Sequence, residues 1–354
     1  IDPSYANIAG KLENEFKQQE WYVTAGYSIA MRKGISAAYA ADYFNNTLKR
    51  TDSFAVNFAS PVRNTILNNL SVQWKRRLYS IQANLLYTYI KEKTSFGNTA
   101  SDLQKLTPAV SGSVQPFRKL PLYIRASFKN IFRAPTFDDL YFTNIGNTAL
   151  RPEYAKQYNI GLTIHRQFNT VIQSLILTTD GYYNRVTDKI LAVPRQNLFQ
   201  WSMMNVGTVE IRGLDAAVHF IFFKWKNIDV SLNGNYSYQY AVDLSNAFSS
   251  TYKKQLPYTP KHSGAVNLNI SFRNFSCNYN LTSSSYRYRL GEQIPDNYLS
   301  GWSTLDMTIS YRFATGRQTL TRFFFEANNM GNKQYEIIKY YPMPRFNYRA
   351  GLTV

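Results

Sequence analysis

Three histidines are the side chains of this 354-residue chain that would most readily serve catalysis: His165, His219 and His262. A hydrolase would need one of them beside a serine or aspartate, and no GxSxG or HExxH pattern accompanies any of the three. His165 and His219 fall near predicted tight turns, and His262 begins a predicted strand. The pattern favours structural or solvent-exposed histidines, so we predict no catalytic residue and no enzyme.

The acidic residues do not form a metal-binding pattern. Asp138-Asp139 lacks the glycine and the terminal glutamate of a twelve-residue calcium loop. Because Pro135 and Thr136 precede the pair, it is better interpreted as the capped start of a short helical turn. The single cysteine, Cys277, excludes an internal disulfide framework and a cysteine cage for zinc. We therefore predict no metal and no cofactor.

The net charge of +18 and the pI of about 9.7 raise the question of an anionic partner. Nucleic acid and anionic lipid are the usual partners of such a chain. The basic residues are scattered, however, and recur at predicted tight turns rather than in one block. This distribution favours a solvated surface over a nucleic-acid site, and leaves open a basic lumen that attracts an anionic ligand.

The elements that position these residues are strands. A mean hydropathy of −0.36 and the lack of a long apolar run argue against a transmembrane helix. Apolar and polar residues alternate with period two in about fifteen segments, the pattern of a half-buried strand. A membrane strand needs only about 9–11 such residues, and the 16% aromatic content suits the girdles of a membrane barrel. The strands are predicted at Trp21–Arg32, Ile35–Tyr43, Thr65–Lys75, Tyr79–Lys91, Lys105–Pro116, Leu122–Arg133, Tyr154–Arg166, Val171–Val186, Val206–Phe223, Ile228–Val242, Lys261–Phe272, Phe275–Tyr288, Ser303–Phe313, Arg322–Asn329 and Arg345–Val354.

Short and long connections alternate along this series of strands. The long ones are predicted at Asn45–Asn64, Glu92–Gln104, Ala134–Glu153, Thr187–Asn205, Asp243–Pro260, Arg289–Trp302 and Met330–Pro344. A closed antiparallel barrel with short periplasmic turns and long extracellular loops has this alternation, whereas a soluble sandwich mixes lengths at both ends. We therefore predict an all-β, transmembrane, antiparallel up-and-down β-barrel.

One long connection organises the chain, within the stretch Ser127–Leu162. Pro135 and Pro152 interrupt any strand there, and Gly146-Asn147 provides turn geometry. It also carries an aromatic cluster, which suits a loop over a barrel mouth better than a loop of a soluble domain.

The motifs in and after this stretch resemble the C-terminal half of a TonB-dependent outer-membrane receptor. In the family's order they are FRAPTFDDLY, GNTALRPE, YYNRVTDKI, NVGTVEIRGLD (Asn205–Asp215) and ANNMGNKQYEIIKYYPMPR (Ala327–Arg345). FRAPTFDDLY together with LAVPRQNLFQWSMMNVG looks most like the vitamin B12 (cobalamin) receptors within the family. Siderophore, haem and glycan receptors share much of this frame and stay open as alternatives.

The resemblance and the odd strand count both predict an incomplete barrel. Plugged outer-membrane transporters have barrels of about 22 strands. About 15 strands are visible in this sequence. We therefore interpret residues 1–354 as the C-terminal portion of a receptor barrel, with the N-terminal plug and the first strands missing. Because open strand edges are costly in lipid, the fragment is not expected to be stable alone.

The resemblance implies an outer-membrane active-transport receptor of a Gram-negative bacterium for a scarce, bulky nutrient. The implied partners are the TonB–ExbB–ExbD complex acting through the missing N-terminal region, the nutrient, outer-membrane lipid and a surface lipoprotein, with no nucleic acid. A passive porin-like channel is the alternative from another class. Aromatic side chains in the long connections are the candidate ligand contacts, because large rings give contact area at low entropic cost. They are Phe137, Tyr141, Phe142, Phe199, Trp201, Tyr258, Tyr298, Tyr340 and Tyr341.

Overall fold

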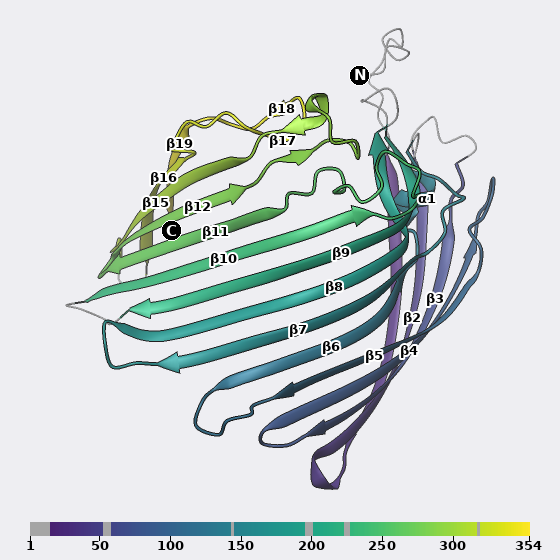
Figure 1. The fold of residues 1–354 in the computed structure, drawn as a ribbon, viewed down its shortest axis with the longest axis horizontal. Coiled ribbons are helices and arrows are strands. Elements are labelled where there is room, and N and C mark those ends of the chain that lie inside the picture. Colours follow the sequence, from purple (N-terminus) through teal and green to yellow (C-terminus); the bar gives the residue numbers. More distant parts are fainter. Residues whose placement is uncertain (1–14, 52–57, 143–144, 195–200, 223–226, 317–318) are drawn as a thin grey trace. The chain divides into compact units, whose positions relative to one another are not determined.

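The computed structural model describes residues 15–51, 58–142, 145–194, 201–222, 227–316 and 319–354. Fifteen strands form one sheet, in which each strand pairs with the strands of this sheet that come before and after it along the chain (Figure 1). They are β1 Phe16–Ala30, β2 Ile35–Arg50, β3 Val62–Lys75, β4 Tyr79–Lys93, β5 Leu103–Val114, β6 Leu122–Arg133, β7 Glu153–Gln167, β8 Ile172–Pro194, β9 Trp201–Phe222, β10 Ile228–Asp243, β11 His262–Phe272, β12 Phe275–Ser284, β15 Trp302–Ala314, β16 Leu320–Asn328 and β19 Asn347–Thr353. This order confirms the predicted all-β, antiparallel up-and-down topology.

The remaining elements lie in the connections. They are α1 Phe137–Tyr141, the hairpin of β13 Arg287–Tyr288 with β14 Tyr298–Leu299, the hairpin of β17 Glu336–Ile338 with β18 Tyr341–Pro342, and 3-10 turns at Arg32–Gly34 and Pro295–Asn297. None of the helices in the described ranges is long and apolar enough to cross a membrane.

The chain divides into two compact units, which are described separately. The first unit comprises Ile1–Ser113, Ser127–Tyr158 and Asn184–Val209, and the second comprises Val114–Ala126, Asn159–Tyr183 and Glu210–Val354.

Cross-strand register gives each unit one apolar and one polar sheet face. In the first unit, Tyr27, Tyr39, Leu70 and Leu85 lie side by side in one row across β1 to β4. These four side chains are exposed. Because side chains alternate between faces, the next row lies on the opposite face, and it is mostly polar: Ser28, Ala38, Ser71 and Asn84. The apolar row is the lipid-facing pattern of a membrane strand.

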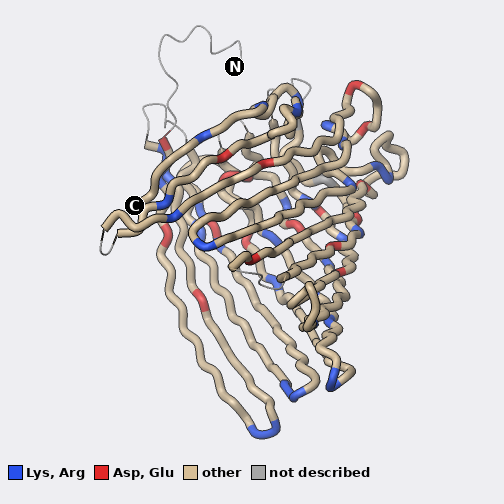
Figure 2. Tube along the Cα trace, turned by 90° about the vertical axis from the view of Figure 1, so that its left-hand side faces the viewer, with Lys and Arg blue, Asp and Glu red and all other residues tan. Residues whose placement is uncertain are grey.

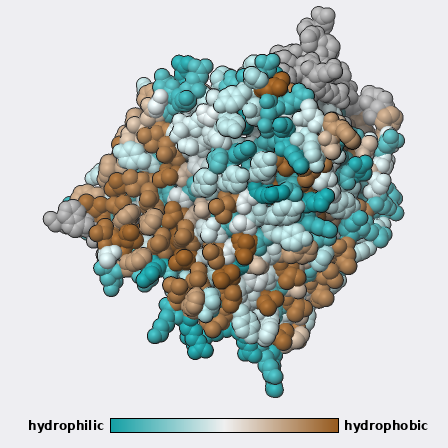
Figure 3. Space-filling model, in the orientation of Figure 1, coloured by the Kyte–Doolittle hydropathy of each residue, from teal (hydrophilic) through white to brown (hydrophobic). Residues whose placement is uncertain are grey.

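The second unit shows the same division. One face carries rows such as Leu232, Leu268, Tyr279 and Met307, whereas the opposite face carries Asn233, Asn267, Asn280 and Asp306. Figure 3 shows hydrophobic side chains gathered over the strands β8 to β12 of this unit. Hydrogen bonds between side-chain amides on neighbouring strands pair some of the polar groups on this face. In one of them, Asn267 Nδ2 donates to Asn278 Oδ1 at 2.9 Å.

The predicted long connection Thr187–Asn205 is wrong. β8 continues through Val186 to Pro194, and β9 begins at Trp201. The reason is a cross-strand contact that the local sequence does not show: the side chain of Asn205 on β9 donates to the Asp188 carbonyl on β8 at 2.7 Å. The boundary at Tyr288 is also wrong, because β12 ends at Ser284 and the following residues form the small β13–β14 hairpin.

Gly34, in the short turn between β1 and β2, gives the first prediction. Its φ is +73°, and a Cβ there would lie 2.2 Å from the carbonyl oxygen of Lys75. We expect Gly34→Ala to destabilise the full-length protein by about 2–3 kcal/mol, because left-handed strain adds to a backbone clash. Urea unfolding in detergent micelles, followed by tryptophan fluorescence, measures the change.

Gly97 is a matched control because its φ is +75° and nothing lies within 4 Å of its built Cβ. Gly97→Ala should cost only the conformational part, about 1 kcal/mol. Equal costs at the two positions would show that the Lys75 contact has no energetic effect.

Candidate functional site

The connection between β6 and β7, in the first unit, contains the one-turn helix α1. Thr136 caps it: its hydroxyl accepts from the Asp139 N–H at 3.1 Å, and its own N–H donates to Asp139 Oδ2 at 2.9 Å. Pro135 precedes the cap, and Asp138 and Asp139 lie in the first turn. This capping box confirms the interpretation of the acidic pair as a helix start, because the local sequence alone determines it.

A buried charge network docks α1 on the strands. The Glu92 side chain, 2% exposed, accepts from Arg63 Nε at 2.5 Å and from the Tyr141 hydroxyl. Arg63 and Glu92 are direct cross-strand neighbours on β3 and β4. On the other side of the helix, Arg133 Nη1 lies 3.0 Å from Asp139 Oδ2. The helix is therefore held by ion pairs and hydrogen bonds from the ends of three strands.

The aromatic side chains predicted for this connection have different environments. Phe137 and Tyr141 are buried in a cluster with Leu48, Leu140 and Ile190. Such burial suits packing of the loop, and their contact with a ligand stays a prediction.

Phe142 is 42% exposed and stacks on Phe16, with ring centroids 5.8 Å apart. Trp201 is the first residue of β9 and is half-buried. Phe199 lies outside the described residues. Among the predicted residues of this unit that the structure describes, Phe142 thus has the most accessible ring.

In the second unit, three connections bind one another. They span residues 244–261, 285–301 and 329–346. Arg287, 4% exposed, donates from Nη2 to the carbonyl oxygens of Glu336 and Ile337 at 2.5 and 2.8 Å. The Tyr258 N–H donates to the Tyr288 carbonyl at 2.7 Å. Burial lowers the pKa of the Arg287 guanidinium, and these carbonyl contacts offset the cost of burying its charge.

The predicted tyrosines of this unit lie in these connections. Tyr298 stacks on Tyr286 at 5.6 Å between ring centroids, and Tyr288 packs edge-on against Tyr298 at 5.9 Å. Tyr298, Tyr340 and Tyr341 are exposed, the last two by more than 60%. Tyr258 is half-buried. The structure therefore packs Tyr286, Tyr288 and Tyr298 together and leaves the rings of Tyr298, Tyr340 and Tyr341 exposed.

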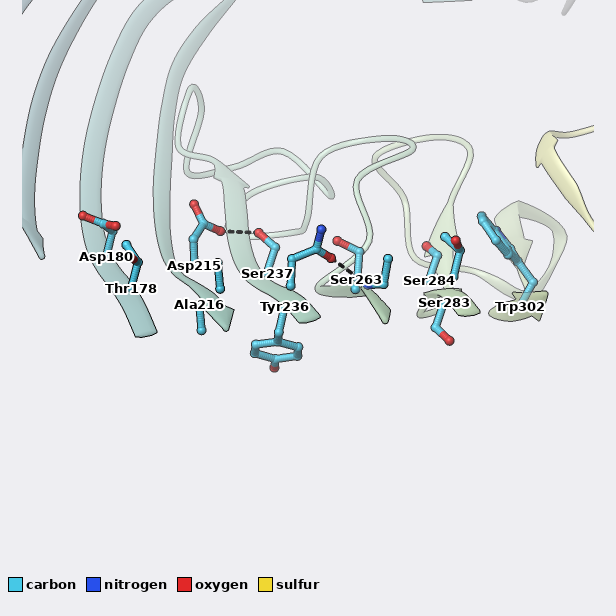
Figure 4. Close-up of a pocket in the computed structure, with 15 residues that line it drawn as sticks. Thr178, Asp180, Asp215, Ala216, Tyr236, Ser237, Ser263, Ser283, Ser284 and Trp302 are labelled. Atoms are coloured by element: carbon cyan, nitrogen blue, oxygen red, sulfur yellow. Dashed lines mark hydrogen bonds between the residues drawn. The ribbon is translucent and has the colours of Figure 1, made fainter. Parts of the chain in front are cut away.

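A pocket of about 600 Å³ lies along the polar face of β8 to β15. Asp215, Ser237 and Asp180 line one end of it, and Ser237 Oγ donates to Asp215 Oδ1 (Figure 4). Trp302 lines the other end and stacks on Tyr335 of the 329–346 connection, with ring centroids 4.5 Å apart. The stack therefore links the pocket wall to the loops that carry the exposed tyrosines.

The histidines show no nucleophilic arrangement in the part of the chain that the structure describes. His219 Nδ1 contacts Asn233 Oδ1, and His262 Nδ1 lies 2.8 Å from the Tyr236 hydroxyl. Over the same ranges, no group of three His, Cys, Asp or Glu side chains is placed to hold a metal ion.

The antiparallel sheet and its long connections agree with the match of this sequence to a protein-family model. The family model described as TonB dependent receptor-like, beta-barrel, matches residues 4–330. The chain belongs to the TonB-dependent receptor family.

Partial matches to curated relatives concern vitamin B12 transporters. The chain is 32% identical over 102 residues to the Vitamin B12 transporter BtuB of Photobacterium profundum, covering 28% of this chain and 16% of that protein. It is 30% identical over 89 residues to the BtuB of Vibrio vulnificus, covering 25% and 14%.

Solved structures show the fold at low sequence identity. The copper transporter OprC matches with a TM-score of 0.72 at 14% identity, over 96% of this chain and 56% of its own. BauA, the ferric preacinetobactin receptor from Acinetobacter baumannii, matches with a TM-score of 0.69 at 13% identity, over 95% and 54%. The chain thus spans about half the length of these receptors.

The phenol of Tyr141 predicts how the docking of α1 on the strands depends on pH. Burial, and then the hydrogen bond to Glu92, raise the pKa of the Tyr141 phenol above its ordinary value of about 10. Below pH 10 the phenol is protonated in both the docked and the undocked loop, so docking is unaffected. Above pH 10 only the undocked loop releases the proton, so docking weakens as the pH rises.

Hydrogen exchange of the α1 amides between pH 8 and 11, corrected for intrinsic rates, measures this effect. Tyr141→Phe should remove the alkaline loss of protection, because no phenol remains to ionise. An unchanged alkaline loss in that variant would assign it to another group.

Proposed function

We propose that this chain is part of an outer-membrane active-transport receptor for a scarce, bulky nutrient, and that the nutrient is vitamin B12. The observation that carries the choice of nutrient is the pair of partial matches to vitamin B12 transporters at 30% identity or above. Family membership supports the transport class, and the accessible tyrosines of the 285–301 and 329–346 connections support binding of a large ligand.

In this proposal the ligand binds first to exposed rings at the long connections. Phe142, Tyr298, Tyr340 and Tyr341 are the accessible members of the predicted set. Trp201 and Tyr258 are half-buried and would contact ligand only at their edges. The ligand then passes along the polar face lined by Asp215 and Ser237, while the TonB–ExbB–ExbD complex supplies the energy. A surface lipoprotein would be a further partner on the exposed loops.

Equilibrium binding of cyanocobalamin to the full-length protein, purified in detergent, tests the choice of nutrient. Saturable binding at or below micromolar concentration, unaffected by excess ferric siderophore, would support it. Saturable binding of a ferric siderophore, haem or an oligosaccharide without cyanocobalamin binding would replace the nutrient and keep the receptor class.

Planar-bilayer conductance separates the receptor from a passive channel. A receptor should conduct little in the absence of an energised partner. Steady conductance by the full-length protein would favour a porin-like channel and contradict active transport.

A further inference from the structure

The short connections carry a concentration of positive charge in both units. In the first unit the turn after β1 holds Arg32 and Lys33, and the turn after β3 follows Lys75 with Arg76 and Arg77. All five side chains are exposed. Lys and Arg mark the tips of short hairpins in Figure 2.

The second unit repeats the pattern. The turn between β5 and β6 holds Arg118 and Lys119, Arg166 precedes the turn after β7, and Arg273 forms the turn after β11. These four side chains are also exposed. The described parts of the short connections, 31–34, 76–78, 115–121, 168–171, 273–274, 315–316 and 319, contain no Asp or Glu.

The ion pairs of the described residues lie elsewhere in the protein. They join side chains such as Arg63 with Glu92, or Arg125 with Asp180, away from the short connections. None of the ion pairs found in the described ranges involves the basic residues of the short turns. A solvated surface in a soluble protein would mix both signs, so the one-sided composition calls for an anionic partner.

Apolar side chains adjoin the basic ones. Arg166 lies over the ring of Phe168 at 5.3 Å, and Arg273 lies over the ring of Phe272 at 5.2 Å. Phe117 beside Arg118 is 57% exposed, and Val171 is 77% exposed. In the first unit the exposed Trp74 precedes Lys75-Arg76-Arg77 and packs edge-on against Tyr79, with ring centroids 5.0 Å apart. Amphipathic rings beside cations are the arrangement of a membrane interface, where the ring faces acyl chains and the cation faces headgroups.

We propose that the short-turn ends bind the headgroups of anionic phospholipids in the membrane leaflet that they face. The phosphate oxygens of such lipids accept hydrogen bonds from guanidinium and ammonium groups, and their acyl chains contact the neighbouring rings. A soluble anion without an apolar part, such as free phosphate, would not use the apolar side chains. The inference goes beyond the proposed transport function and is independent of which nutrient is carried.

The test uses the full-length protein in a neutral detergent, titrated with fluorescent phosphatidylglycerol and, separately, phosphatidylcholine. The short-turn variant is R76Q/R77Q/R118Q/K119Q. Each basic residue near an anionic surface is worth about fivefold in affinity, so we expect at least a tenfold loss for phosphatidylglycerol and no change for phosphatidylcholine. The preference should also weaken between 50 mM and 500 mM salt.

The matched control, K91Q/K93Q/K253Q/K254Q, removes four exposed charges at the opposite strand ends and should bind phosphatidylglycerol as the unaltered protein does. An equal loss in the control would overturn the proposal in favour of a net-charge effect. Competition by glycerol 1-phosphate at the lipid concentration would also overturn it, because a free phosphate would then suffice. If the short-turn variant does not fold, the titration of the unaltered protein tests the proposal by itself. Equal binding of phosphatidylglycerol and phosphatidylcholine, or a preference that salt does not weaken, would contradict the proposal.

Discussion

Replacing Glu92 by alanine is expected to release the α1 connection and to lower its docking free energy by about 3 kcal/mol. The glutamate is almost fully buried and accepts from both Arg63 and Tyr141. Its removal leaves a guanidinium that is only 14% exposed without a counter-charge, and such truncations of buried pairs cost about 3–5 kcal/mol. We expect a cost at the lower end of this range because the Arg63 guanidinium also lies over the Phe137 ring, 4.9 Å from its centroid, and this cation–π contact remains after the substitution.

Native-state hydrogen exchange of the full-length receptor measures this release. The protection of the α1 amides should fall by about a hundredfold, because each 1.4 kcal/mol changes an opening equilibrium tenfold. Amides in the middle of β3 and β4 should change much less, since their ladder stays intact.

Glu326→Ala is the matched control. Glu326 faces Arg349 directly across β16 and β19, as Glu92 faces Arg63 across β4 and β3. The Arg349 side chain, however, is 70% exposed. An exposed pair is worth about 1 kcal/mol or less, so the control should barely change exchange around its own pair. A Glu92 effect no larger than the control effect would contradict the assigned role of the buried network.

Local sequence patterns predicted the strands and α1 because their causes lie within a few residues. Alternation with period two determines which residues can line one sheet face, and the Thr136–Asp139 box closes over one helical turn. The error at Thr187–Asn205 has the opposite origin. The described residues of that range, 187–194 and 201–205, extend β8 and β9 because each strand finds a partner across the hairpin, as in the contact of Asn205 with Asp188. Turn-like sequence cues do not contain that information.

The loop contacts of the second unit could not be predicted from the sequence for a related reason. Arg287 binds backbone carbonyls 49 and 50 residues away, and a carbonyl is present at every residue. Asp215 and Trp302 were missed as pocket residues because only the strand register shows which face they share with Ser237 and Ser284. The contact of the aromatic residues with a ligand stays a prediction.

Arg287→Ala is expected to separate the 285–301 connection from the 329–346 connection. The substitution removes two charge-assisted hydrogen bonds to the carbonyls of Glu336 and Ile337, each worth about 1.5–3 kcal/mol. We expect a net loss of about 3 kcal/mol rather than the full sum, because Nη1 has no hydrogen-bond partner among the described residues and its burial already costs energy. The amides of β17 should lose about a hundredfold in exchange protection.

The loss should extend to ligand binding if the exposed tyrosines carry it. Tyr340 and Tyr341 lie at the β17–β18 hairpin, and Tyr298 pairs with Tyr288 beside Arg287. Once the connections separate, binding has to order them again, and the affinity of the full-length receptor falls by the free energy of that ordering. Affinity for the nutrient proposed above should therefore decrease at least tenfold, with a smaller decrease for Arg345→Ala, whose exposed side chain donates to Gln334 within the same connection.

Arg287→Met separates hydrogen bonding from packing. Methionine keeps much of the volume of the arginine stem but donates no hydrogen bond, and hydrophobic replacement of a buried charge is often tolerated. If the two carbonyl contacts hold the connections together, Arg287→Met loses β17 protection as Arg287→Ala does. Protection restored to the level of the unaltered protein would mean that the buried stem holds the loops together. The guanidinium would then contribute no net stabilisation, in agreement with its lowered pKa and with an Nη1 that has no partner among the described residues.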